Sequence, residues 1–224
     1  TRHRTAERTA EETDLTVITV SEESSLVKVF NNAGTTELEG PSVILGRVNE
    51  SLQSVDRMRR RFDDAVAELG ELEIENSLTN QEVLEVIQRG ELLTRLAKQV
   101  RTEALKLGGE AGLILIQIDS FESGVKNTFN LVLKDHLPSK KYRNISKAVE
   151  EISQLSYEEL NNIDFLCSVL SKLPLDDLSI AKGYRVLARL PNLPENLHDS
   201  LVHKFKTLPK LLTSSPENLY SVEG

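Results

Sequence analysis

The cationic residues that could bind phosphate lie near the two ends of the chain. At its start, "TRHRTAER" places Arg2, His3 and Arg4 in succession, with Arg8 one helical turn further on. Guanidinium groups bind phosphate oxygens, and backbone amides at a helix start near Thr5 would add to the binding of an anion. Taken alone, however, this run is more typical of an exposed basic helix start than of an anion site.

A second group of cations follows Ala181. Six cations and two acids lie between Lys182 and Lys210, a net charge of +4, in a chain whose formal net charge is −8. Because the overall charge repels polyanions, a nucleic-acid site would have to be a local basic island such as this one. For any single cation here, a solvated surface side chain is the simpler interpretation. The six are Lys182, Arg185, Arg189, Lys204, Lys206 and Lys210.

Other reactive side chains show no catalytic pattern. Cys167 is the only cysteine, which excludes a disulfide within one chain, and its apolar neighbours predict a buried thiol. Three histidines lack a carboxylate or cysteine at ligand spacing and are interpreted as surface residues: His136, His198 and His203. The run "RMRRR" at 57–61, with aspartates nearby, is typical of a salt-bridged helix face.

Composition narrows the class of protein. With 39% hydrophobic and 28% charged residues, the chain suits exposed helices better than a deep sheet. Tryptophan is absent and aromatics make up 4%, so stacking on single-stranded bases is not expected as a main activity. No apolar run approaches the roughly 18 residues of a membrane span, and no leader pattern is present. We therefore expect a cytoplasmic protein with no membrane partner.

Local patterns predict a small α/β portion followed by helices. Residues 5–13 suit a short helix, Leu15–Val20 and Ser25–Phe30 read as strands, and "NNAG" at 31–34 predicts a turn. Two strands are too few to be stable alone. We interpret them as part of an α/β or mixed unit.

Helical spacing of apolar residues begins near Pro41. It runs from Ser42 to Leu69, where Gly70 is a predicted stop or kink. A second helix is predicted from a capping box at Thr79 and Glu82 to Leu107, and "GLILIQI" is assigned as helix because helices surround it. Further helices are expected at 120–136, 141–154 and 156–172, the last with a capping box at Ser156 and Glu159. Together they predict an extended helical spine.

The region after Ala181 alternates short apolar helices with tight turns rich in Pro and Gly. A hairpin, "LPNLP" at 190–194, is predicted between helices at 184–189 and 195–205. Ser215 followed by Pro216 is a typical helix start. The fold class predicted for the whole chain is α+β, mostly α.

Three blocks resemble one family. "TRHRTAERTAEETDLTVITVSEE" is similar to the block of diadenylate cyclase domains in which Gly-Thr-Arg-His-Arg precedes a short helix, a strand and a Ser-Glu turn. "LEIENSLTNQEVLEVIQRGELLTRLAKQV" resembles the helical spine of the DisA family of diadenylate cyclases, and residues 181–224 resemble its tandem helix-hairpin-helix tail. The order and spacing of the blocks fit the family along essentially the whole chain.

The resemblance implies three domains. Residues 1–41 would be the C-terminal part of the cyclase domain, 42–180 the helical linker or spine, and 181–224 an incomplete helix-hairpin-helix DNA-binding domain. Against the family's pattern we expect the sequence to begin within the Arg-His-Arg block, without the upstream Asp-Gly-Ala motif, and to end inside the second hairpin at Gly224.

The implied reaction condenses two ATP into cyclic di-AMP and pyrophosphate, with Mg²⁺ or Mn²⁺ as cofactor. Carried over by position, Thr1 would donate a hydroxyl, Arg2 and Arg4 would clamp charge, and His3 would contact phosphate. Ser21 would also contact nucleotide, although a turn serine is an equal interpretation. Glu22 and Glu23 are better read as a solvated turn than as metal ligands, so the metal ligands stay unassigned.

Two features of the implied reaction bear on this chain. The catalytic acid belongs to the upstream motif, so we predict that these residues alone do not cyclise ATP. Each ATP must also face a second one, which requires a homo-oligomer; the family suggests an octamer.

The C-terminal block implies binding of branched DNA or recombination intermediates without regard to sequence, in a nucleoid-associated protein. The six cations of the basic island and Asn192 are the candidate contacts. Asn192 stands where the family's hairpin has Gly, and Pro191 and Pro194 lack an N–H, which weakens the phosphate cradle. Bound DNA would lower cyclic di-AMP synthesis. The alternative is a non-catalytic, DNA-binding oligomeric scaffold.

Overall fold

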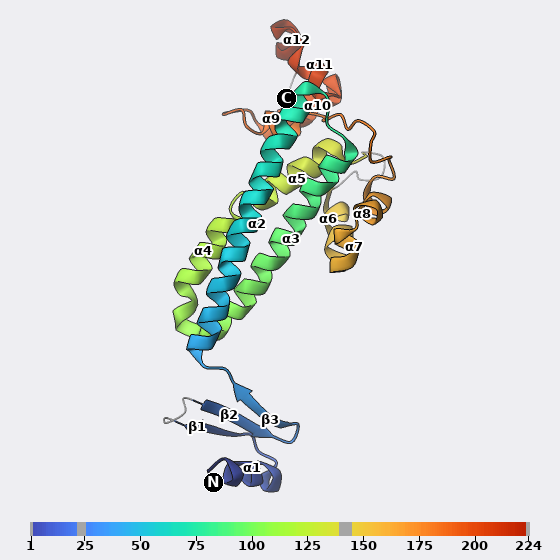
Figure 1. The fold of residues 1–224 in the computed structure, drawn as a ribbon. Coiled ribbons are helices and arrows are strands. Elements are labelled where there is room, and N and C mark those ends of the chain that lie inside the picture. Colours follow the sequence, from blue (N-terminus) through green and yellow to red (C-terminus); the bar gives the residue numbers. More distant parts are fainter. Residues whose placement is uncertain (1, 22–25, 139–144, 223–224) are drawn as a thin grey trace. The chain divides into compact units, whose positions relative to one another are not determined.

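The computed structural model describes residues 2–21, 26–138 and 145–222. Within them the chain is mostly helical with one small sheet, which confirms the predicted α+β class (Figure 1). It divides into two compact units, Thr1–Ser54 with Gln99–Ile118, and Val55–Lys98 with Asp119–Gly224. None of the described helices combines the length and apolar composition that crossing a membrane requires.

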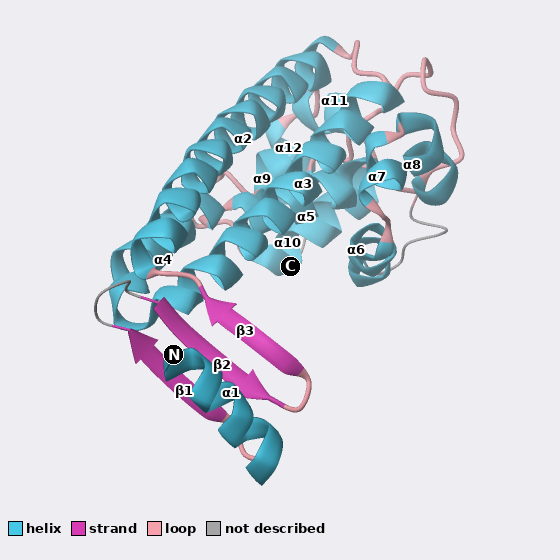
Figure 2. Ribbon diagram, turned by 60° about the horizontal axis from the view of Figure 1, so that its bottom comes forward, coloured by secondary structure: helices cyan, strands magenta, loops and turns pink. Residues whose placement is uncertain are grey.

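The first unit contains a helix on a three-stranded sheet. Helix α1 (Arg2–Thr13) precedes strands β1 (Val17–Ser21), β2 (Leu26–Asn31) and β3 (Gly34–Leu38), which pair antiparallel in the order β1-β2-β3. Figure 2 shows α1 lying across one face of the sheet, where Ala6, Ala10 and Phe30 form a small core. The other face leaves apolar side chains exposed, with Ile18 at 63% and Val20 at 72%.

Strand β3 was not predicted. The "NNAG" turn is confirmed as the β2–β3 connection, with Asn31 opposite Gly34. The strand that follows, "GTTEL", is exposed along its whole length. It therefore lacks the alternation of apolar and polar residues from which a half-buried strand is recognised.

Helix α2 (Pro41–Glu75) is one 35-residue helix that contributes to both units. The stop predicted at Gly70 is wrong, since the helix continues for five more residues. A glycine inside a helix costs only about 1 kcal/mol, and the packing of Leu69, which is 1% exposed, outweighs that cost. The chain leaves the helix at Asn76, whose φ of 57° is a left-handed conformation that asparagine tolerates.

Helix α3 (Asn80–Ala104) begins at the predicted capping residues. The Oε2 atom of Glu82 accepts hydrogen bonds from the backbone N–H of Thr79 at 2.7 Å and from its hydroxyl at 3.0 Å. In the second unit, α3 and α2 lie side by side (Figure 1). The predicted break after Leu107 falls in the 3₁₀ helix η1 (Leu105–Ala111), where Gly108 has a φ of 59°. "GLILIQI" is confirmed as helix, within α4 (Gly112–Glu122).

Close packing in the second unit depends on Gly90 of α3. A β-carbon at this position would lie 2.7 Å from Cδ2 of Phe129 and 3.0 Å from Cε2 of Phe62. Both rings are buried, at 7% and 1% exposure. The two phenylalanines therefore occupy the space that a side chain at residue 90 would need.

Four helices follow in the second unit: α5 (Val125–His136), α6 (Ile145–Gln154), α7 (Tyr157–Asn161) and α8 (Ile163–Leu170). The capping box at Ser156 and Glu159 is confirmed. The single helix predicted over 156–172 is wrong, because Asn162 adopts an extended conformation and caps a new helix by accepting the N–H of Phe165 at 3.0 Å. The first residues of the helix predicted at 141–154, up to 144, lie outside the described residues.

The C-terminal part of the second unit is built from four short helices around its own core. They are α9 (Tyr184–Leu187), α10 (Glu195–Phe205), α11 (Leu208–Leu212) and α12 (Pro216–Tyr220). The core consists of Ala181, Leu187, Leu201, Val202, Leu208 and Leu211. The predicted start at Ser215 is confirmed, since its side chain caps α12.

Candidate functional site

The Arg-His-Arg block lies in the first turn of α1. The Nδ1 atom of His3 is 3.1 Å from the hydroxyl oxygen of Thr19 on β1, and the imidazole ring lies 6.4 Å from the ring of Phe30. His3 is therefore held against the sheet, whereas the neighbouring Arg4 is exposed. Thr1 lies outside the described residues.

The structure describes the backbone of two further predicted nucleotide contacts, Arg2 and Ser21. Arg2 is the first residue of α1, and Ser21 is the last residue of β1, where it is partly buried and pairs in register with Leu26. Glu22 and Glu23 lie outside the described residues. The start of α1 and strand β1 thus belong to the same unit, and the contact between His3 and Thr19 links them.

Among the described residues, no three His, Cys, Asp or Glu side chains are grouped so that they could hold a metal ion. The predicted Mg²⁺ or Mn²⁺ cofactor therefore stays a prediction.

The predicted C-terminal hairpin joins α9 to α10. Asn192 has a φ of 64°, so it takes the left-handed conformation for which the family's glycine is suited, and its short amide side chain makes that conformation tolerable. Within the described residues, the backbone N–H groups of Asn192 and Leu193 donate no hydrogen bond. Helix α10 also begins without a side-chain cap. Unused amides therefore gather at this turn despite Pro191 and Pro194.

The cations of the basic island fall into two groups. Arg189, Lys206 and Lys210 are exposed, and no ion pair joins them to another described residue. Lys204 is exposed as well, but its Nζ donates to the carbonyl oxygen of Asn218 at 2.9 Å and so ties α10 to α12. Four cations of the island are therefore exposed, and Arg189, Lys206 and Lys210 are the three that we consider for the DNA surface.

Lys182 and Arg185 are turned into the protein. The Nζ of Lys182 donates to the carbonyl oxygens of Lys134 at 2.8 Å and Leu137 at 2.7 Å. Burial lowers the pKa of Lys182, and the nearby carboxylate of Asp135 opposes this. Arg185 is 5% exposed. Because their charges are already used inside the protein, we leave both residues out of the DNA surface proposed below.

Arg185 belongs to a buried ionic cluster with Glu73 and His136. One oxygen of Glu73 accepts from Nη1 of Arg185 and lies 2.9 Å from Nε2 of His136, while Nη2 of Arg185 donates to the carbonyl oxygen of Val66 at 2.9 Å. Burial on its own would raise the pKa of Glu73, but the hydrogen bond from His136 and the charge of Arg185 bring it below its usual value. Glu73 is therefore held as a carboxylate.

Asp135 caps α9 across a long stretch of sequence. Its two oxygens accept the N–H groups of Gly183 and Tyr184 at 2.7 Å and of Arg185 at 2.9 Å. Burial raises the pKa of Asp135, although the charge of His136 and these amides oppose the shift. The cap fixes the start of the helix-hairpin-helix core to the end of α5.

The interpretation of His136 as a surface residue is wrong. Its side chain is 1% exposed, and its second ring nitrogen, Nδ1, lies 3.0 Å from the hydroxyl oxygen of Ser179. The spacing of residues in the sequence did not indicate a carboxylate partner for His136, because that partner, Glu73, is 63 residues away. The adjacent pair Asp135-His136 at the end of an apolar helix was the available signal.

The "RMRRR" segment is salt-bridged, as predicted. Arg59 contacts Asp63 at 2.8 Å, and Arg60 contacts Asp56 at 2.7 Å. Arg59 also donates to the carbonyl oxygens of Phe121 and Ser123 and so links α2 to the segment before α5. Cys167 is a buried thiol, as predicted, and its Sγ lies 2.9 Å from the carbonyl oxygen of Leu173.

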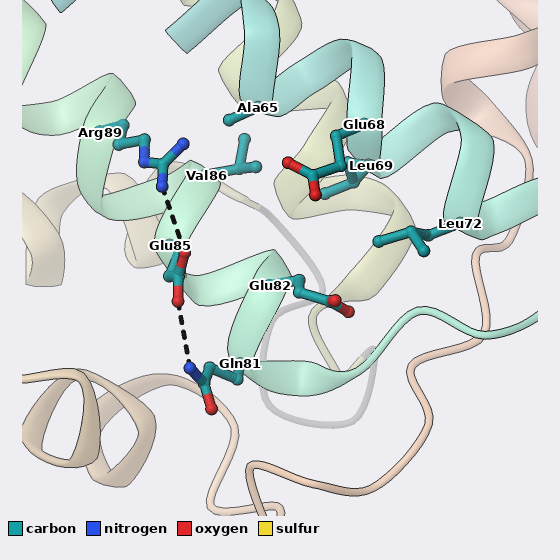
Figure 3. A pocket seen from close by; sticks show the side chains of 9 residues that line it. All are labelled: Ala65, Glu68, Leu69, Leu72, Gln81, Glu82, Glu85, Val86 and Arg89. Atoms are coloured by element: carbon teal, nitrogen blue, oxygen red, sulfur yellow. Dashed lines mark hydrogen bonds and ion pairs between the residues drawn. The ribbon is translucent and has the colours of Figure 1, made fainter. Parts of the chain in front are cut away.

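An acidic pocket of about 260 Å³ lies between α2 and α3 (Figure 3). Glu68, Glu82 and Glu85 contribute carboxylates to its wall, and Arg89 contacts Glu85 at 3.3 Å. Three carboxylates against one guanidinium repel a phosphate group. This pocket is therefore not a site for ATP or DNA.

A larger groove of about 610 Å³ lies beside the hairpin. Its wall combines α5, α9 and the start of α10, and it includes Lys134, Tyr184 and Leu193. Sequence patterns do not indicate this groove, because its residues come from segments that are far apart in the chain.

Known proteins match along the whole chain. The family model described as the DisA bacterial checkpoint controller linker region matches residues 38–172. The chain is 36% identical to the DNA integrity scanning protein DisA of Kineococcus radiotolerans, 34% to that of Acidothermus cellulolyticus and 33% to that of Streptomyces coelicolor. Each alignment covers 100% of this chain and 64%, 62% and 62% of the respective relative, so the chain spans slightly less than two thirds of their length.

Proposed function

Because this chain belongs to the DisA family of DNA integrity scanning proteins, we propose that it is the part of a diadenylate cyclase that couples a nucleotide site to DNA binding. The enzyme would condense two ATP into cyclic di-AMP, as an octamer with facing sites. Branched DNA at the C-terminal helix-hairpin-helix core would lower that synthesis.

The observation that carries the DNA proposal is the hairpin between α9 and α10. Among the described residues no acceptor is found for the N–H groups of Asn192 and Leu193, and α10 starts without a side-chain cap. These amides are donors of the kind that bind phosphate oxygens. The exposed side chains of Arg189, Lys206 and Lys210 supply positive charge around the same core. Contacts of this kind position a protein on the DNA backbone without reading bases.

The first turn of α1 supports the nucleotide proposal. Arg4 is exposed there, no acidic residue lies in that turn, and His3 is oriented by Thr19. A helix start with adjacent cations attracts an anion such as a triphosphate. The acid that would act on the 3′-hydroxyl is proposed to lie in the upstream part of the domain.

DNA binding is tested by a triple variant, Arg189→Ala with Lys206→Ala and Lys210→Ala, in a shift assay on junction DNA over a range of salt. Each lost phosphate contact should reduce the slope of log affinity against log salt by about 0.9, so the slope should fall by nearly three. The control replaces three exposed cations elsewhere, Arg60, Lys126 and Lys147, by alanine and should keep the slope. An unchanged slope in the first variant would contradict the DNA surface.

Catalysis is tested in the protein that includes the upstream part of the cyclase domain, with ATP and magnesium or manganese. Arg4→Ala should lower cyclic di-AMP formation by about a hundredfold, the usual effect of removing a group that stabilises developing charge. DNA affinity should not change. If the unsubstituted protein turns over no ATP, the scaffold alternative is favoured.

A further inference from the structure

The groove beside the hairpin has the chemistry of a nucleobase site. Its volume of about 610 Å³ lies in the range of roughly 300–1,000 Å³ that small-ligand pockets occupy. Three asparagines, Asn127, Asn130 and Asn196, line the groove, and within the described residues no hydrogen bond is found for their side-chain amides. An amide offers one acceptor and two donors, which is the pattern that pairs with the edge of a base.

An aromatic face stands beside these amides. The ring of Tyr184 lines the groove, and Nζ of Lys134 lies 5.3 Å from its centre. Its hydroxyl donates to Asp199 at 3.0 Å, which holds the hydroxyl end of the side chain in place. Burial and this carboxylate raise the pKa of Tyr184 to about 12, so the phenol stays protonated and remains a donor. A base can stack on such a face whatever its identity.

A ring nitrogen of His198 is buried. The Nε2 atom of His198 is inaccessible, and no hydrogen-bond partner for it is found among the described residues. His198 itself lines the groove. Buried polar groups are nearly always hydrogen-bonded in folded proteins, so this nitrogen has unused hydrogen-bonding capacity in a residue of the groove wall.

The position of the groove favours DNA as the source of the base. Leu193, one of the two residues with an unused amide in the hairpin, also lines the groove, and Asn196 lies in the first turn of α10. A strand whose phosphates contact the hairpin would therefore have an unpaired nucleotide within reach of the amides and the Tyr184 ring. We propose that this groove binds an unpaired base of the DNA that the hairpin holds, and so favours branched or bulged DNA over a continuous duplex.

This inference rests on the proposed function, since it assumes that the hairpin binds DNA. A low aromatic content does not oppose it, because one ring serves one base. A free nucleotide would offer the same base chemistry, and the experiment separates the two sources.

The test uses the full chain with a fluorescent adenine analogue, 2-aminopurine, placed as the single unpaired nucleotide of a bulged duplex. Competition compares this DNA with the fully paired duplex of the same length, and a third arm uses AMP alone. We expect about a tenfold preference for the bulged DNA, the size of effect that stacking one base produces, together with a change in 2-aminopurine emission. AMP alone should bind weakly, because it lacks the phosphate contacts.

The variants Asn130→Leu and Asn196→Leu remove two amides, and Asn49→Leu makes the same substitution on an exposed face of α2. Thermal unfolding checks that each variant is folded. The groove variants should lose the preference for bulged DNA and keep their affinity for the paired duplex, whereas Asn49→Leu should keep both.

Three results are decisive. An equal affinity of the unsubstituted chain for both DNAs overturns the groove proposal while leaving DNA binding intact. Binding of AMP at the groove as tight as that of bulged DNA assigns the site to a free nucleotide and overturns DNA as the source. A lower salt slope in the triple cation variant, together with a preference of the unsubstituted chain for bulged DNA, supports both proposals.

Discussion

At the residue scale, the cluster of Glu73, His136 and Arg185 shows how ionised groups are kept inside the protein. A carboxylate that is 6% exposed is stable here only because two side chains share one of its oxygens. Removing Arg185 alone leaves the buried carboxylate of Glu73 with His136 but without a guanidinium, which is costlier than removing the charges of Arg185 and Glu73 together. The cluster should therefore respond very differently to single and double substitutions.

Arg185→Met is expected to destabilise the protein by about 3–5 kcal/mol, because it takes the guanidinium away from the buried carboxylate of Glu73. Urea unfolding measures the change. Arg60→Met, which breaks the exposed pair with Asp56 where the arginine side chain is 75% exposed, should cost no more than about 1 kcal/mol. Adding Glu73→Gln to Arg185→Met should recover part of the loss, and a strictly additive double variant would contradict the coupling.

The cluster also predicts a pH dependence. The pKa of Glu73 is lower in the folded chain than its ordinary value of 4.5, so folding favours the carboxylate. Its contribution to stability should be complete above that value and should disappear as the pH falls through the lower, folded pKa. The difference in unfolding free energy between the unsubstituted chain and Glu73→Gln should shrink as the pH falls below about 4.5. A difference that grows on acidification would contradict the assignment.

At the scale of elements, two glycines within helices have opposite roles. A β-carbon at Gly90 would meet the rings of Phe129 and Phe62, whereas one at Gly46 would meet nothing within 4 Å. Both positions lie inside long helices, where alanine is intrinsically preferred by roughly 0.5–1 kcal/mol. At Gly90 the surrounding rings determine how an added methyl changes stability, whereas at Gly46 helix propensity determines it.

Gly90→Ala should destabilise the chain by about 1–3 kcal/mol, because the added methyl overpacks a buried contact. Gly46→Ala is its matched control and should stabilise by up to about 1 kcal/mol. Thermal unfolding followed by circular dichroism distinguishes the two signs. Equal shifts in the same direction would show that the contact with the phenylalanine rings has no energetic weight.

Local signals in the sequence predicted most elements but not the contacts between distant segments. The capping box at Ser156 and the turn at 31–34 were predicted because the residues that determine them are adjacent in sequence. Strand β3 lacks buried residues, and the extension of α2 past Gly70 depends on tertiary packing, so neither had a local signal. The inward orientation of Arg185 could not be predicted, since its partner Glu73 lies 112 residues earlier.

At the scale of the whole molecule, the two units differ in how much core they bury. The helix-and-sheet portion of the first unit is held by three buried residues, Ala6, Ala10 and Phe30, whereas α3 and α5 pack through many fully buried side chains. Regions with few buried apolar contacts open at a lower free energy than the global unfolding step. The sheet is therefore expected to be the less stable part.

Native-state hydrogen exchange should show this difference. The amides of β1 to β3 should exchange faster than those of α3 and α5 by at least about a hundredfold, equivalent to nearly 3 kcal/mol. Denaturant in the sub-unfolding range should leave the exchange of the sheet amides almost unchanged, because they open locally. Uniform protection across both groups would show instead that the chain unfolds as one cooperative unit.

The thiol of Cys167 provides a natural reporter of such opening events. It is the chain's one cysteine, it is buried in α8, and its sulfur lies 2.9 Å from the carbonyl oxygen of Leu173. A thiol in that position is shielded from alkylating reagents until the end of α8 separates from the segment after it. Its labelling rate therefore follows the opening of this region without any engineered probe. The same burial protects this thiol from oxidants while the protein is folded.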